Sequence, residues 1–152
     1  MKKRVVLVIA LVTTILISCY KVPITGRRQV NLIPESEMIG MSLTNYKDFL
    51  TQNPPVAAGN ADEQLVKRVG AKISSAVEAF MKEKGLSQRL EGYQWEFNLV
   101  NQNEVNAWCM PGRKVAVYSG IIPLTKNDAG LATVMGHEIG HAIAHHSAER
   151  IS

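Results

Sequence analysis

The sequence predicts an α+β domain that is mainly helical and carries a smaller amount of β-strand. Two observations predict the helices: apolar residues recur at three- and four-residue steps over 62–84, and again from about residue 127 onward. A third observation is the alternation of large apolar and polar residues in "YQWEFNLV", which is typical of a half-buried strand. With 152 residues, 46% hydrophobic and 20% charged, the chain has the composition of one globular domain.

The N-terminal residues have the pattern of a secretory leader. Three basic residues at 2–4 precede an apolar run at 5–17, which as a helix would span only about 20 Å and is too short to cross a membrane. The following "LISC" resembles the lipobox of bacterial lipoproteins. We therefore expect 1–18 to be a lipoprotein signal peptide and Cys19 to carry the lipid; an ordinary signal peptide or anchor with a chance cysteine is the alternative. Residues 19–34, interrupted by two prolines and a glycine, are expected to form a tether.

The charge gives no argument for a nucleic-acid partner. The chain has 17 Lys and Arg against 13 Asp and Glu, but three of the basic residues belong to the leader. The remaining domain is nearly neutral and lacks the excess of basic residues that nucleic-acid binding needs. We therefore expect no nucleic-acid partner.

The cysteine count excludes an internal disulfide if the leader interpretation holds. The chain has two cysteines, and a lipidated Cys19 leaves Cys109 without a partner. Cys109 is then either a reactive thiol or a small, half-buried residue beside Trp108.

The elements after residue 34 follow from local patterns. A first helix, 35–50, begins after Pro34 with two glutamates in its first turn. The helix over 62–84 has acidic residues at its start, lysines near its end and Gly85 as a stop. The remaining elements are a strand at 93–100, a loop at 101–113, a second β-rich run at 114–120 and a last helix from Asn127 or Asp128.

The last helix carries "HEIGH", an HExxH motif, at His137–His141. Four residues advance a helix by about 400°, so both imidazoles face one side and can reach one ion. Glu138 lies beside the metal-bound water, where it can act as general base. The spacing predicts a zinc site with His137 and His141 as ligands and Glu138 as the catalytic residue. The alternative is a histidine-rich surface helix without a metal.

Other polar residues near the motif lie too far along the helix to bind the same ion. His145 is two turns beyond His137, about 12 Å along the axis. His146 and Glu149 are also expected to be outside reach. Glycine lowers helix stability, so Gly136 and Gly140 suggest the close approach of another element.

Three stretches carry a resemblance to a known family. "TGRRQVNLI" (25–33), "NAWCMPGRKVAVYSGII" (106–122) and "LATVMGHEIGHAIAHHSAERIS" (131–152) resemble, in this order, the HtpX-like and CAAX-prenyl-protease-like zinc metallopeptidases, peptidase family M forty-eight. The likeness is greatest to their bacterial periplasmic lipoprotein branch, of the BepA and LoiP type. The resemblance implies a zincin-like domain with a small sheet beside the HExxH helix, and one zinc ion per chain.

The same resemblance implies a function, a place in the cell and substrate contacts. It implies a zinc-dependent endopeptidase that cleaves cell-envelope proteins in quality control, anchored by lipid at Cys19 and facing the periplasm, with the choice of membrane left open. "KVAVYSG" looks like the family's edge strand, along which an extended peptide could pair. The implied substrate contacts are Asn106, Ala107, Val115 and Val117. One departure is Arg113, where relatives often have glycine.

In this family the third zinc ligand is a glutamate on a later helix. The resemblance therefore implies that 35–152 is the N-terminal part of a zinc metallopeptidase domain, with that ligand expected beyond Ser152. The alternative is a truncated, non-catalytic or chaperone-like envelope lipoprotein with an incomplete metal site.

Overall fold

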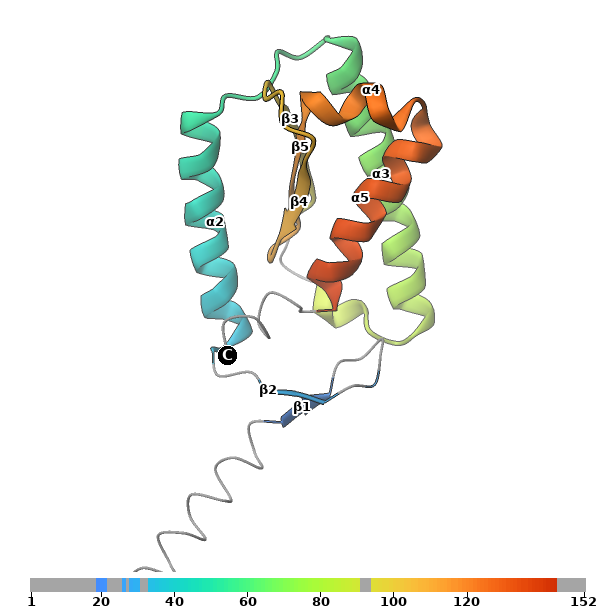
Figure 1. Ribbon diagram of the computed structural model, residues 1–152. Helices are drawn as coiled ribbons and strands as arrows, with labels where there is room; N and C mark the ends of the chain where they lie inside the picture. The colour runs from blue at the N-terminus through green and yellow to red at the C-terminus, as the bar shows by residue number, and fades with distance from the viewer. Residues whose placement is uncertain (1–18, 22–25, 27, 31–32, 91–93, 145–152) are drawn as a thin grey trace, which may run out of the picture.

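The computed structural model describes residues 19–21, 26, 28–30, 33–90 and 94–144 (Figure 1). Its helices and strands confirm the predicted α+β class. α2, α3 and α5 correspond to the three predicted helices, and each predicted boundary lies within two residues of the observed one. The α-helices are α2 (Glu35–Gln52), α3 (Ala61–Glu83), α4 (Ile122–Thr125) and α5 (Asp128–Ile143), with 3-10 turns η1 (Ser87–Leu90) and η2 (Ser119–Ile121). The strands are β1 (Cys19–Lys21), β2 (Arg28–Val30), β3 (Glu96–Val100), β4 (Ala107–Met110) and β5 (Lys114–Tyr118).

The main sheet of the described residues has the strand order β3–β5–β4. β3 runs parallel to β5, with Phe97 opposite Val115, and β4 runs antiparallel to β5, with Ala107 opposite Val117. The expectation that "KVAVYSG" forms the edge strand is therefore wrong, because β5 is paired along both of its sides. β4, which the sequence placed in a loop, is one of the two edges.

The helices cover both faces of this sheet. Figure 1 shows α2 on one side of the strands and α3 with α5 on the other. The core lies between the sheet and the α3–α5 pair. Its buried residues are Val66, Val69, Phe97, Leu99, Ala107, Val115, Val117, Ile121, Leu131, Met135 and Ile139.

An aromatic cluster attaches α2 to the opposite face of the sheet. The Phe49 ring meets Trp108 edge-on at 4.8 Å and stacks on Tyr118 at 6.1 Å. The Tyr46 hydroxyl donates to the Val115 carbonyl at 3.2 Å, and burial raises the pKa of that hydroxyl above its ordinary value. Its polar tip is therefore satisfied inside an apolar layer, and α2 has a fixed position on the sheet.

The packing of α3 on the sheet depends on a glycine. A Cβ placed on Gly70 would lie 2.5–2.7 Å from three ring atoms of Phe97. The Phe97 ring is itself stacked on Trp95, with a centroid distance of 5.8 Å. The missing side chain lets α3 approach β3 closely.

The start of α5 is fixed by its N-cap and by an ion pair. The Asn127 side chain accepts a hydrogen bond from Gly130 N–H at 3.0 Å, which satisfies one free donor of the first turn. Arg68 of α3 donates two hydrogen bonds to the Asp128 carboxylate, at 3.0 and 3.2 Å. These contacts hold the N-terminus of α5 against α3.

The segment expected to be a tether contains the short antiparallel pair β1–β2, with Cys19 opposite Val30. The sequence did not predict these strands. The expected signal peptide, 1–18, lies outside the described residues. None of the helices in the described ranges is long and apolar enough to span a membrane.

Candidate metal centre

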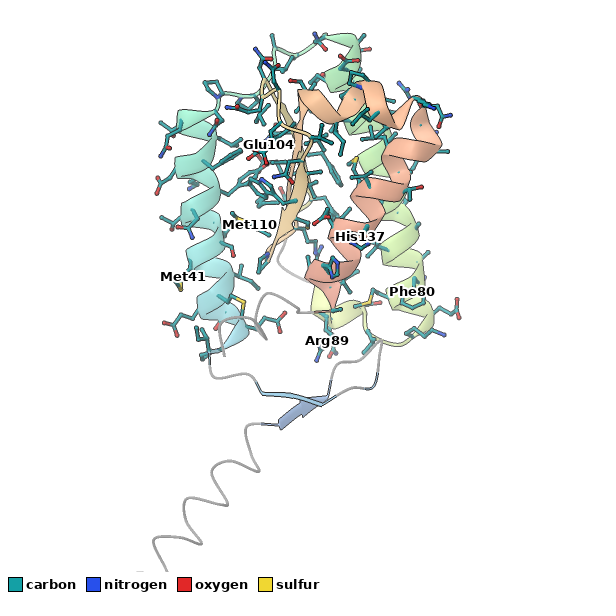
Figure 2. The ribbon with its side chains drawn as sticks, in the orientation of Figure 1. Met41, Phe80, Arg89, Glu104, Met110 and His137 are labelled. Carbon is teal, nitrogen blue, oxygen red and sulfur yellow. The ribbon has the colours of Figure 1, made fainter. Side chains whose placement is uncertain are left out.

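The HExxH motif lies on α5, as the sequence predicted. The core side of this helix is formed by Leu131, Met135 and Ile139, which are at most 1% exposed. His137 follows Met135 by two positions, about 200° around the helix, and is therefore directed away from the core. Figure 2 labels its side chain on α5. The packing that orients the helix also presents the first histidine to solvent.

The two histidines of the motif converge. His137 Nε2 and His141 Nε2 are 3.0 Å apart, and their rings are inclined at 85°. At this distance one ring can donate a hydrogen bond to the other, depending on the tautomers, or both can direct lone pairs at one cation. The i, i+4 spacing thus brings two nitrogen ligands together.

The nitrogen separation fits zinc. Two imidazole nitrogens at about 2.0–2.1 Å from a tetrahedral zinc ion are about 3.3–3.4 Å apart. The distance of 3.0 Å between the two Nε2 atoms is within a few tenths of an ångström of that value. A small rotation of either ring would make the pair a two-point zinc ligand. Imidazole nitrogens are common zinc ligands, so the two histidines fit two positions of a tetrahedral zinc site.

The described residues contain no group of three His, Cys, Asp or Glu side chains that could hold a metal. His145, His146 and Glu149, which the sequence analysis excluded from the site by helix geometry, lie outside the described residues. The two-histidine ligand set is therefore incomplete within the part of the chain that is described.

Glu138 lies next to the sheet. It is half-buried, and its charge acts on the thiol of Cys109 on β4. Burial, and then the nearby Glu138, raise the pKa of the Cys109 thiol to about 12. Such a thiol is neutral at ordinary pH, which agrees with the half-buried interpretation of Cys109 and not with a reactive thiol. Cys109 forms part of the surface beside the predicted general base.

The glycines beside the histidines have no close neighbour among the described residues. A Cβ on Gly136 or Gly140 would meet no atom of these residues within 4 Å. The expected close approach of another element is therefore not present in the described structure. The helix face carrying these glycines and His137 is open there.

The four predicted substrate contacts fall into two groups. Asn106 and Ala107 lie at the start of β4, and the Asn106 side chain donates to Glu104 at 3.2 Å. Val115 and Val117 are fully buried, and the strand that carries them is paired on both sides. A substrate cannot reach these two valines in this fold, so the expectation for them is wrong.

Sequence reasoning also missed β4, which lies at an edge of the described sheet. α5 makes most of its sheet contacts with β4 and fewer with β5, and β4 is an edge of the described sheet, so β4 is the edge nearer to α5. The apolar run in "KVAVY" indicates that both faces of this strand are covered, but it does not show which strand is the edge, since "AWCM" of β4 is equally apolar.

A small sheet beside a helix with convergent HExxH histidines is the arrangement of a metallopeptidase. A model described as "Peptidase family M48" matches residues 67–152, which is more than half of the chain. The chain therefore belongs to peptidase family M48.

Similar proteins come from a mitochondrion and from bacteria. The chain is 42% identical over 91 residues to mitochondrial metalloendopeptidase OMA1 of Arabidopsis thaliana, covering 60% of this chain and 17% of that protein. It is 29% identical over 129 residues to metalloprotease YcaL of Escherichia coli, covering 82% and 50%. It is 37% identical over 54 residues to the beta-barrel assembly-enhancing protease of Escherichia coli, covering 36% and 11%. The chain spans at most half the length of these three relatives.

Proposed function

We propose that this protein is a zinc-dependent metalloendopeptidase. The observation that carries the proposal is the 3.0 Å distance between His137 Nε2 and His141 Nε2. These histidines belong to an HExxH motif that also contains Glu138, in a chain of peptidase family M48. His137 and His141 would hold the ion through Nε2, and a third ligand from outside the described residues would complete the site. This third ligand is expected to be a glutamate, as in the family that the chain resembles.

The chemistry divides between the ion and one side chain. Zinc in this position would polarise the scissile carbonyl and make a bound water more acidic. Glu138 takes a proton from the attacking water and later passes it to the leaving amine. Glu138 is half-buried near the neutral thiol of Cys109. No residue of β4 carries a charge that would attract or repel its carboxylate.

The backbone of β4 offers a place for the substrate. The Tyr118 N–H donates to the Asn106 carbonyl at 3.0 Å, so Asn106 directs its backbone oxygen toward β5. Antiparallel partners alternate between hydrogen-bonded and non-hydrogen-bonded pairs. The backbone groups of Ala107 and Cys109 therefore point away from β5, to the outer edge of the described sheet. An extended peptide would add there as a further strand, recognised through its backbone and tolerant of sequence.

The proposed cellular role rests on a short sequence near the N-terminus and on the name of one relative. The "LISC" sequence supports lipid attachment at Cys19, and a bacterial relative is named a beta-barrel assembly-enhancing protease. We therefore place the protein at the bacterial cell envelope, facing the periplasm, with envelope proteins as substrates and a role in quality control.

One observation favours a second candidate. Because the described residues supply only two of the ligands, an envelope lipoprotein with weak zinc binding and a chaperone-like, non-catalytic role is the alternative. Two histidines without a third ligand leave the remaining positions to water and bind zinc weakly.

The test uses the full chain with Glu138→Gln and, as a matched control, Glu78→Gln on the exposed face of α3. We expect one zinc per chain after dialysis, cleavage of casein by wild type and by Glu78→Gln, and a loss of at least about 100-fold with Glu138→Gln. Full casein cleavage by Glu138→Gln would refute its role as general base. No retained zinc and no cleavage, with suppression of client aggregation, would support the chaperone-like alternative.

A further inference from the structure

The segment between β3 and β4 crosses the end of β5. Because β5 lies between β3 and β4, the chain that leaves β3 after Val100 must pass over the end of β5 to begin β4 at Ala107. Val100 and Ala107 are paired with Tyr118 and Val117 respectively, so the crossing lies directly over η2. This crossing segment, 101–106, carries Asn106 to the substrate edge.

Ser119 holds the crossing segment in place through hydrogen bonds to the backbone of Gln102. Its hydroxyl accepts from Gln102 N–H at 3.1 Å and lies 3.0 Å from the Gln102 carbonyl, to which it can donate. Gly120 N–H donates to the same carbonyl at 2.8 Å. The Gln102 side chain in turn donates to Asn53 at the end of α2, at 2.6 Å. The backbone of Gln102 is thus held at both its polar groups.

Gly120 makes the crossing possible by its lack of a side chain. A Cβ there would lie 2.3 Å from the Asn103 carbonyl oxygen and 2.6 Å from that of Glu104. Both atoms belong to the backbone, so no rotamer change can relieve the overlap. Gly120 does not have a positive φ, so the requirement for glycine is steric and not conformational.

We propose that Ser119 and Gly120 are positioning residues that set the register of the β4 edge for substrate; this inference rests on the peptidase function proposed above. With alanine at 120, the crossing backbone must move by about 0.7 Å to restore a contact of 3.0 Å. The displaced residues lead directly into Asn106 and the backbone groups of Ala107. Peptide pairing at this edge weakens in the ground state and the transition state alike, so KM rises while kcat changes little.

The test compares Gly120→Ala with Gly70→Ala in the full chain. Gly70→Ala creates a similar overlap, with Phe97 in the core, but does not touch the crossing segment. We expect both variants to lose stability. Only Gly120→Ala should raise KM for a casein-derived peptide, by about 10-fold with kcat within about twofold. Ser119→Ala should raise KM in the same direction, and Ser119→Thr, which keeps the hydroxyl, should restore most of the wild-type value.

A binding measurement and a backbone measurement separate this inference from the function on which it rests. In a Glu138→Gln background, the Kd of the labelled peptide should rise with Gly120→Ala and not with Gly70→Ala. Amide exchange of Trp108, which is bonded to β5, should also quicken with Gly120→Ala alone. Equal KM, Kd and exchange in the two glycine variants would overturn the positioning role. If wild type neither cleaves nor binds the peptide, the proposed function fails. Unequal Trp108 exchange would then show that Gly120 positions β4, but not for this substrate.

Discussion

The substitution Gly70→Ala isolates the cost of the closest helix–sheet contact. The added methyl would lie 2.5, 2.6 and 2.7 Å from Cγ, Cδ1 and Cδ2 of Phe97, and ordinary contact requires about 1 Å more. Phe97 is 9% exposed and stacked on Trp95, so moving its ring away from the methyl would disturb the packing of the core. Overpacking of this kind costs about 1–3 kcal/mol. Alanine also favours the helix over glycine by about 1 kcal/mol, which opposes that cost.

Gly40 provides a matched control. It lies inside α2, and a Cβ there would meet nothing within 4 Å. Gly40→Ala should therefore stabilise the protein by about 1 kcal/mol, the helix-propensity term alone. The difference in unfolding free energy between the two alanine variants then equals the overpacking cost, about 1–3 kcal/mol.

The assay is urea unfolding followed by far-ultraviolet circular dichroism, with unfolding free energies from linear extrapolation. Combining Gly70→Ala with Phe97→Leu should cost less than the sum of the two single changes, because the smaller side chain makes room for the methyl. The reasoning would be refuted if Gly70→Ala were as stable as Gly40→Ala.

Three further predictions concern single residues. Because the pKa of the Cys109 thiol is raised to about 12, its alkylation by iodoacetamide at pH 8, measured by peptide mass spectrometry, should be about a thousandfold slower in the folded protein than in urea. Equal rates would show that the thiol is exposed. Lys126 has φ 63° and lies in a three-residue turn closed by a 2.7 Å bond from Asn127 N–H to the Thr125 carbonyl. Lys126→Gly should therefore raise the urea midpoint by relieving about 1 kcal/mol of strain, whereas Lys47→Gly inside α2 should lower it. The Arg68 guanidinium, by its hydrogen bonds, holds the pKa of Asp128 below its ordinary value. The stability that Asp128 contributes is then present at neutral pH and lost as the pH falls below about 4, through its folded-state pKa. Carbon-detected titration should show this pKa rising in Arg68→Gln, and an unchanged pKa would contradict the assignment.

The parts of the fold that the sequence predicted are those fixed by local patterns. α3 was expected at 62–84 and spans Ala61–Glu83, because its apolar stripe and charged ends lie within the helix itself. β4 was missed because "AWCM" is only four residues long and contains no alternation. The strands β1 and β2, three residues each, offered even less pattern. Short strands depend on partners distant in the sequence, and their own residues carry little of that information.

The glycines show the same division between local and non-local information. In the sequence Gly40, Gly70, Gly136 and Gly140 are equivalent, since each is a helix-breaking residue inside a helical pattern. The prediction of close approach was made for Gly136 and Gly140, yet among these four glycines the close contact in the described structure occurs at Gly70. The residue that decides this is Phe97, and its distance from Gly70 is set by the way α3 packs on the sheet.

The candidate site has one part that depends on local sequence and one that depends on contacts distant in the sequence. The histidine pair was therefore predictable, and the sheet edge was not. The His137–His141 pair depends only on helical geometry, so a five-residue motif was enough to predict that two imidazoles converge, and their Nε2 atoms lie 3.0 Å apart. The substrate edge depends on strand order, and that order depends on segment 101–106 crossing the end of β5. The crossing requires a residue without a side chain at Gly120, eighteen positions before Glu138 in the sequence. The proposed chemistry therefore follows from the motif, whereas the proposed peptide edge depends on a glycine outside the motif.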